Sequence, residues 1–145
     1  PGLDKGKVWH CRKNLNIKAM EDAVKYIIGK HDFTSFRTSK CQAKSPIRTL
    51  DEITFSHDNE EIIMKVKAPS FLHSQVRIIA GTIVKIGEGN WEPRIMKSIL
   101  NAKDRTLAGP TAPPEGLYLE RVDYPENLLN HNWPIIYDSK KSDHY

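Results

Sequence analysis

Cysteine is scarce in this sequence and long hydrophobic runs are absent, and each shortage excludes a class of protein. Cys11 and Cys41 are the only cysteines in 145 residues, and neither belongs to a Cys-x-x-Cys pair. Although two cysteines could form one disulfide, nothing else suggests a secreted scaffold, so we expect reduced thiols. We expect no signal peptide, and every apolar run is far shorter than the roughly 20 residues of a membrane helix. We therefore expect a cytoplasmic protein with no membrane partner.

Motifs for metal ions and for bound phosphates are also missing. None of the six histidines lies three or four residues from another, and no cysteine lies at ligand spacing. Residues 87–89 do not form a Walker loop, because no Gly-Lys-Ser/Thr follows and Glu88 would repel phosphate. No nucleophile elbow is present either. We expect no metal site, and we interpret residues 87–89 as a helix stop.

The charge balance is mildly basic. Lysine and arginine total 22 residues against 18 aspartates and glutamates, which gives a net charge of +4 and a pI of about 9.1. This excess permits a polyanionic partner but does not require one. The chain is long enough for one domain with a hydrophobic core, and its 39% hydrophobic and 28% charged residues are typical of soluble globular proteins.

Hydrophobic periodicity and turn residues predict an α+β domain over residues 1–124, followed by a polar tail over 125–145. Expected strands cover residues 7–11, 46–55, 62–68 and 117–124, and expected helices cover 17–28, 70–87 and 92–102. Asn16 is the expected N-cap of the first helix, and Gly29 ends it. Expected non-regular segments are an irregular stretch at 31–45, a turn at 56–60 and a Pro/Gly loop at 108–116. This order favours a mainly antiparallel sheet with helices packed on one face.

The expected helix over 70–87 has two unlike faces. Its apolar stripe, at helical period, consists of Leu72, Val76, Ile79, Ile83 and Ile86. The roughly opposite face carries small residues and one cation, namely Ser70, Ser74, Gly81 and Arg77. Small residues allow another surface to approach closely, so we expect Arg77 to be buried or nearly so. A buried guanidinium stays charged and needs an oriented acceptor, preferably a carboxylate bound by two parallel hydrogen bonds.

The sequence supplies no acid close to Arg77 along the chain. No aspartate or glutamate occurs between Glu61 and Glu88, so a carboxylate must come from a distant segment, another chain or a missing part of the protein. The chain begins at Pro1 rather than at a methionine, and we therefore expect a fragment or a processed product. The alternative is a structural arginine that anchors a loop carbonyl or a core carboxylate. Helix geometry alone leaves the two roles equally open.

Several cations and two aromatic residues are candidates for contact with RNA. The cations that could neutralise phosphates are Arg37, Arg48, Lys103 and Arg105. Phe33 or Phe36 could stack on a base. The ordinary alternative is that such cations are solvated and that the phenylalanines belong to the core. His73 lies one turn before Arg77, where it could share its face or simply be a polar residue at a helix start.

Four blocks of this sequence resemble the C-terminal half of the TruA-type tRNA pseudouridine synthases. They are GKHDFTSFR (29–37), CQAKSPIR (41–48), SFLHSQVRIIAGTIVKIG (70–87) and AKDRTLAGPTAPPEGLYLERVDY (102–124). The blocks follow in the family's order, and the tail beyond them is not covered. The resemblance implies an RRM/ferredoxin-like pseudouridine synthase half that uses no metal and no organic cofactor.

The resemblance also implies a reaction and roles for individual residues. The family works as a homodimer and isomerises uridines at positions 38, 39 and 40 of the tRNA anticodon stem-loop. An aspartate attacks the nucleoside, the glycosidic bond breaks, and the rotated base reattaches through carbon. Arg77 matches the arginine that forms a salt bridge with this aspartate, and Leu117 matches the leucine that packs near the target base. The expected tRNA contacts are Arg37, Arg48, His73, Lys103 and Arg105.

One departure from the family bears directly on the chemistry. The family's aspartate belongs to a Gly-Arg-Thr-Asp-Ala-Gly motif in the N-terminal half, and this motif does not occur in the sequence. We therefore expect the N-terminal half to be a missing partner and the fragment to be inactive alone. None of the acids present, such as Asp32, Asp51 or Asp104, is expected to replace the nucleophile. The alternative is a non-catalytic tRNA-binding or dimerisation module.

Overall fold

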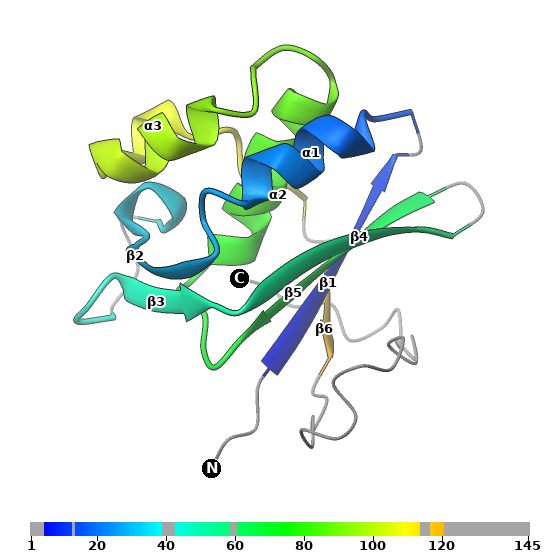
Figure 1. Cartoon of the computed structure of the whole chain (residues 1–145). Coiled ribbons are helices and arrows are strands. Elements are labelled where there is room, and N and C mark those ends of the chain that lie inside the picture. The colour runs from blue at the N-terminus through cyan, green and yellow to red at the C-terminus, as the bar shows by residue number, and fades with distance from the viewer. Residues whose placement is uncertain (1–4, 13, 39–42, 59–60, 114–116, 121–145) are drawn as a thin grey trace.

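The computed structural model describes residues 5–12, 14–38, 43–58, 61–113 and 117–120 (Figure 1). Its main sheet is antiparallel throughout, with the strand order β4-β5-β1-β6. These strands are β1 (Lys5–Arg12), β4 (Glu52–Asp58), β5 (Glu61–Ala68) and β6 (Leu117–Glu120). Residues 121–124 of the expected last strand, and the expected tail over 125–145, lie outside the described residues.

Three helices lie on one side of this sheet: α1 (Ile17–Val24), α2 (Gln75–Gly87) and α3 (Ile95–Ala102) (Figure 1). With the insertion between α1 and β4 set aside, the chain runs β1-α1-β4-β5-α2, then through α3 to β6. With α3 counted as an addition, this is the βαββαβ order of the ferredoxin-like fold. The α+β class, the antiparallel sheet and the placement of the helices on one face are thus confirmed.

Helix α1 begins as expected but ends early. The Asn16 side chain accepts a hydrogen bond from the Ala19 N–H at 3.0 Å, which is an N-cap contact. The Asn16 N–H also donates to the Gly87 carbonyl at 2.9 Å and thereby ties the start of α1 to the end of α2. The helix ends at Val24 rather than near residue 28, and the chain continues through a turn into a short strand that begins at Gly29, where φ is +99°.

Helix α2 begins at Gln75, five residues later than its predicted start at residue 70. Ser74 has a φ of +61°, in the left-handed region, so the helix cannot extend back through it. The Gln75 side chain instead accepts a hydrogen bond from the Leu72 N–H at 2.8 Å. Ser70, His73 and Ser74 therefore lie before the first residue of α2, and the expectation that Ser70 and Ser74 share a helical face with Arg77 is wrong.

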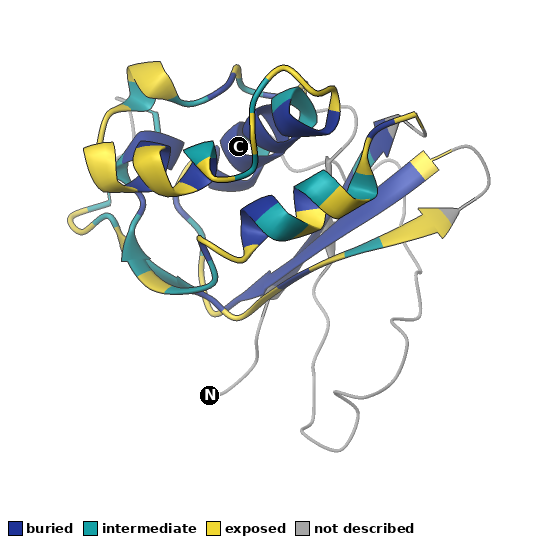
Figure 2. Cartoon of the chain, turned by 45° about the horizontal axis from the view of Figure 1, so that its top comes forward, coloured by how far each residue is buried: buried dark blue, intermediate teal, exposed yellow. Residues whose placement is uncertain are grey.

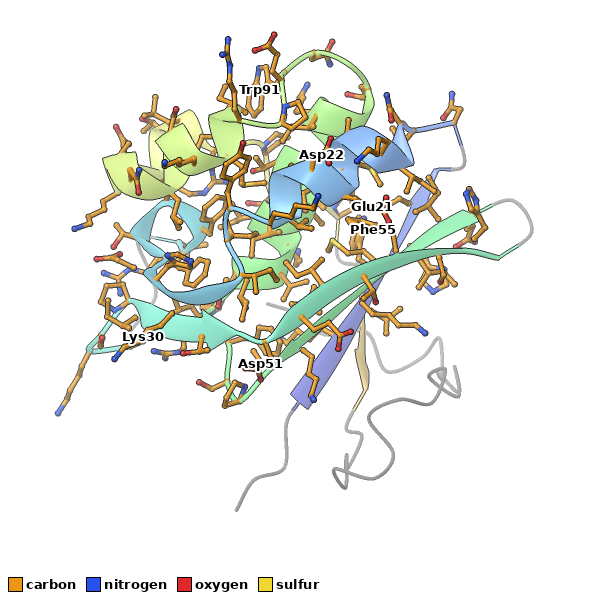
Figure 3. All side chains as sticks on the ribbon, viewed as in Figure 1. Glu21, Asp22, Lys30, Asp51, Phe55 and Trp91 are labelled. Atoms are coloured by element: carbon orange, nitrogen blue, oxygen red, sulfur yellow. The ribbon has the colours of Figure 1, made fainter. Side chains whose placement is uncertain are left out.

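The segment between α1 and β4 contains more regular structure than the sequence predicts. Strands β2 (Gly29–Asp32) and β3 (Ile47–Leu50) form a separate antiparallel pair, and η1 (Thr34–Phe36) is a 3₁₀ turn. The expected single strand over 46–55 is therefore wrong, as is the wholly irregular stretch over 31–45. Asp51 separates β3 from β4, and its N–H donates to the Lys67 carbonyl on β5 at 2.8 Å (Figure 3).

The hydrophobic core lies between the main sheet and the helices. Strand β5 is buried along nearly its whole length, whereas β4 and the outer side of α1 are largely exposed (Figure 2). The fully buried side chains of this core include Met20, Ile27, Ile62, Met64, Ile79 and Ile83. Each such residue contributes about 1.5–3 kcal/mol relative to an exposed position. Within the described part of the chain, no helix is both long and apolar enough to cross a membrane.

Candidate functional site

The small-residue side of α2 is covered by the chain's own Pro/Gly segment, residues 108–112, which we call the clamp loop. A Cβ atom on Gly81 would overlap the Pro110 carbonyl oxygen. In the same way, a Cβ atom on Gly109 would lie 2.7 Å from the Thr82 Cα. In both cases the added Cβ atom would be closer to backbone than real Cβ atoms come, so glycine at these two positions permits the loop backbone to lie directly on the helix. The expected close approach of another surface is confirmed.

Arg77 is half-buried at the point where the clamp loop crosses α2. Its Nε donates a hydrogen bond to the Ala112 carbonyl at 2.8 Å, and the Ala112 N–H donates to the Arg77 carbonyl at 3.0 Å. Loop and helix are therefore joined reciprocally at one residue pair. The structural alternative for Arg77 was that it anchors a loop carbonyl, and its Nε does so.

Thr82 and Arg105 hold the clamp loop from its two sides. The Thr82 hydroxyl accepts from the Gly109 N–H at 2.9 Å and donates to the Ile78 carbonyl at 2.8 Å. Arg105, in the 3₁₀ turn η2 (Arg105–Leu107), donates from Nη1 to the Gly109 carbonyl at 2.9 Å and from Nη2 to the Thr111 hydroxyl at 3.0 Å. Burial lowers the pKa of Arg105, although the guanidinium remains charged at neutral pH.

Sequence reasoning missed this arrangement around Arg77. Thr82 reads as one more small helical residue, and Arg105 reads as an exposed cation at the end of α3. The signal available in the sequence was the Ala-Gly-Pro-Thr-Ala segment over 108–112, since glycine and proline mark a backbone path that few other residues adopt. Nothing in that segment indicated which helix it would contact, because the partners are 27 to 35 residues apart.

The charges of two of the expected RNA contacts, Arg37 and Lys103, act on one carboxylate, that of Asp32. Burial alone would raise the pKa of Asp32, but the Thr34 hydroxyl and N–H, with the charges of Lys103 and Arg37, hold this pKa below its ordinary value. Asp32 accepts from that hydroxyl at 2.6 Å and from that N–H at 2.9 Å. Ser35 joins η1 to the end of α3, because its hydroxyl donates to the Ile99 carbonyl at 2.6 Å and accepts from the Asp104 N–H at 2.7 Å.

The other expected site residues lie elsewhere. Arg48 is on β3 beside His31, and its Nη1 donates to the Ser45 and Ile47 carbonyls at 3.0 and 2.8 Å. His73 is exposed in the turn before α2. Leu117 begins β6 with its backbone opposite Trp9, and its side chain lies outside the described part of the structure.

The two candidate stacking residues belong to the core. Phe33 and Phe36 are fully buried, with their ring centres 6.3 Å apart and the ring planes inclined by 62°. Edge-on packing of this kind stabilises a core and leaves neither ring face open to a base. The stacking hypothesis is therefore wrong for both. Among the described residues, no three His, Cys, Asp or Glu side chains gather as metal ligands would.

Comparison with known proteins assigns the chain to a family. The family model described as tRNA pseudouridine synthase matches residues 23–125, so the chain belongs to the tRNA pseudouridine synthase family. Proteins named tRNA pseudouridine synthase A from Gluconobacter oxydans (strain 621H) and from Ehrlichia chaffeensis (strain Arkansas) are each 49% identical to it. These matches cover 90% and 84% of this chain, but 47% and 50% of the relatives. The chain thus spans about half the length of the curated relatives it matches.

Proposed function

We propose that this chain is the C-terminal half of a tRNA pseudouridine synthase that isomerises uridines at positions 38, 39 and 40 of the tRNA anticodon stem-loop. The observation that carries the proposal is Arg77, a half-buried guanidinium whose Nε is fixed by the Ala112 carbonyl at 2.8 Å in a chain of this family. A guanidinium held in this way is preoriented for a carboxylate.

Arg77 would act on a nucleophile that another part of the enzyme supplies. The Gly-Arg-Thr-Asp-Ala-Gly motif is absent from these 145 residues, so the attacking aspartate is assigned to the N-terminal half. An adjacent guanidinium favours the ionised carboxylate, lowers its pKa and aims one oxygen at the nucleoside. The aspartate attacks the nucleoside, the glycosidic bond breaks, and the base rotates and reattaches through carbon while its bond to the aspartate breaks. The carbon that forms the new bond then loses its proton, and the freed ring nitrogen gains one. Neither a metal ion nor an organic cofactor is required.

The remaining roles concern the grip on tRNA. Arg37 and Lys103, close enough to Asp32 to lower its pKa, are proposed to contact the phosphate backbone together. Arg48 and His73 would add contacts from β3 and from the turn before α2, and Leu117 would pack near the target base. We further propose a cytoplasmic homodimer. A non-catalytic tRNA-binding or dimerisation module is the competing function, because the sequence lacks the nucleophile motif.

The test is to replace Arg77 in a full-length protein that carries this chain and to measure pseudouridine formation in tRNA. Arg77→Ala should lower kcat by about 10²–10³-fold or more, since it removes a charged partner of the nucleophile, and should leave the Kd for tRNA within about threefold. Arg94→Ala is the matched control, because Arg94 is exposed and contacts only Glu92 among the described ion pairs. Near-normal turnover by Arg77→Ala would contradict the assigned role.

A further inference from the structure

The orientation of Arg77 depends on a backbone carbonyl that belongs to a loop, and that loop needs its own support. Ala112 accepts from Arg77, but the neighbouring residues Pro110 and Pro113 have no N–H with which to bind the loop in place. Among the described residues, two outside the loop form side-chain hydrogen bonds with residues 109–111. They are Thr82 from α2 and Arg105 from η2.

We propose that Arg105 is a positioning residue that fixes the clamp loop and, through Ala112, the guanidinium of Arg77. Its two terminal nitrogens bind the Gly109 carbonyl and the Thr111 hydroxyl, at 2.9 and 3.0 Å, respectively three residues and one residue before Ala112. A planar fork that holds two points of one short loop restricts both its position and its rotation. The consequence for catalysis rests on the proposed function.

The contacts of Arg105 favour this role over a phosphate contact. Arg105 is half-buried, and burial lowers its pKa, whereas Lys103 two residues earlier is exposed. A phosphate contact would require the guanidinium to leave two acceptors inside the protein, one of them the carbonyl of the buried Gly109. Loss of such an acceptor's partner is unfavourable, so the charge of Arg105 is used within the chain.

Helix α2 blocks movement of the clamp loop toward it, so the loop could move only away from the helix. The Pro110 carbonyl and Gly109 lie against Gly81 and Thr82 at distances that exclude even a Cβ atom, so the loop cannot shift toward α2. Removal of Arg105 would therefore let residues 109–111 move away from the helix. Such movement would lengthen or bend the hydrogen bond that Arg77 Nε donates to the Ala112 carbonyl. A hydrogen bond weakens steeply as its angle departs from linearity.

The direct experiment measures hydrogen exchange of the Arg77 Nε–H with water by ¹H–¹⁵N NMR on the 145-residue chain, with the signal assigned by Arg77→Lys. Arg105→Ala should accelerate this exchange by about tenfold or more, because the hydrogen bond to Ala112 would be open in a larger fraction of molecules. A tenfold larger open population corresponds to about 1.4 kcal/mol. Arg105→Lys, which keeps the charge but not the fork, should accelerate it as well. Arg94→Ala should leave it unchanged. Equal exchange in Arg105→Ala and Arg94→Ala would overturn the proposal.

Two further measurements keep the proposal testable if Arg105→Ala folds poorly or if the proposed function fails. Thr111→Val removes only the acceptor of the Nη2 bond and should give a smaller acceleration of exchange. If neither Thr111→Val nor Arg105→Lys accelerated exchange, the proposal would be overturned.

In a full-length synthase, Arg105→Ala should lower kcat about tenfold with an unchanged salt dependence of tRNA binding. A weakened affinity with a smaller salt slope and normal kcat would instead identify a phosphate contact. If Arg77→Ala left turnover intact, the proposed function would fail while the exchange result stood.

Discussion

Arg77 combines a structural contact at one atom with a proposed chemical role at others. Its Nε is bonded to the Ala112 carbonyl, and this bond sets the plane in which the terminal nitrogens lie. A flexible arginine would lose rotamer freedom when a carboxylate binds, whereas a side chain already held at Nε loses less. The structural and functional interpretations of Arg77 are therefore compatible, and the first supports the second.

Cys11 gives a prediction at the scale of a single residue. Burial raises the pKa of its thiol to about 12, and the charge of Glu61 adds to the rise. Because the thiolate is the reactive form, Cys11 should react with a disulfide reagent at pH 8 at least about 100-fold more slowly than a free thiol. The measurement uses Cys41→Ser, in which Cys11 is the only cysteine.

The unfolded chain serves as the control for this measurement. In denaturant the same thiol should react at the rate of an exposed cysteine. Since the raised pKa favours the neutral thiol in the folded state, the contribution of Cys11 to stability is fully present below pH 9 and is lost as the pH rises toward 12. Rapid labelling of the folded chain at pH 8 would show that Cys11 is not shielded in this way.

At the scale of elements, the contact between α2 and the clamp loop depends on two glycines. Gly81→Ala gains helix propensity of about 1 kcal/mol, but its methyl group would overlap the Pro110 carbonyl oxygen. Because that oxygen belongs to backbone held by Thr82 and Arg105, we expect a net loss of about 1–3 kcal/mol in the free energy of unfolding, measured by denaturant titration.

An exposed helical position provides the comparison for Gly81→Ala. Ser98→Ala on α3 also gains helix propensity, and Ser98 is exposed. We expect it to be neutral or slightly stabilising. Equal or higher stability of Gly81→Ala would mean that the loop can move away from α2 at little cost.

Local patterns predicted the elements that local physics determines. The Asn16 cap, strand β5 and the sheet class all follow from short-range spacing, whereas the burial of both faces of β5 does not. The start of α2 does not, because the positive φ of Ser74 leaves no trace in a hydrophobic period. The division between β3 and β4 also escapes detection, since Asp51 is fixed by Lys67, sixteen residues away.

For the candidate site, the sequence likewise predicted one residue but not the contacts that it makes. Arg77 stands out in the sequence because it is the only cation on a face of small residues, but its Ala112 acceptor is 35 residues away. Arg105 resembles any surface cation, and only tertiary structure connects it to Gly109 and Thr111. A sequence pattern can mark which side chain is unusual, whereas its partner depends on which loop crosses the helix.

At the scale of the whole molecule, the described residues form a four-stranded antiparallel sheet, a separate two-stranded pair and three helices on one side of the larger sheet. They also contain an arginine that we assign to an aspartate elsewhere. The chain spans about half the length of relatives named tRNA pseudouridine synthase A. The proposed enzyme therefore divides its ion pair between two halves, with the cation here and the nucleophile in the other. Such a division makes activity depend on assembly of both halves rather than on the fold of one.

Pseudouridine formation in a tRNA anticodon stem-loop, compared between the purified 145-residue chain and a full-length protein that carries it, tests this division most directly. The full-length protein should convert its target uridines with multiple turnovers. The 145-residue chain should form no pseudouridine above background at equal concentration, even where it binds the same tRNA. Turnover by the 145-residue chain alone would contradict the account, because the nucleophile would then lie among these 145 residues.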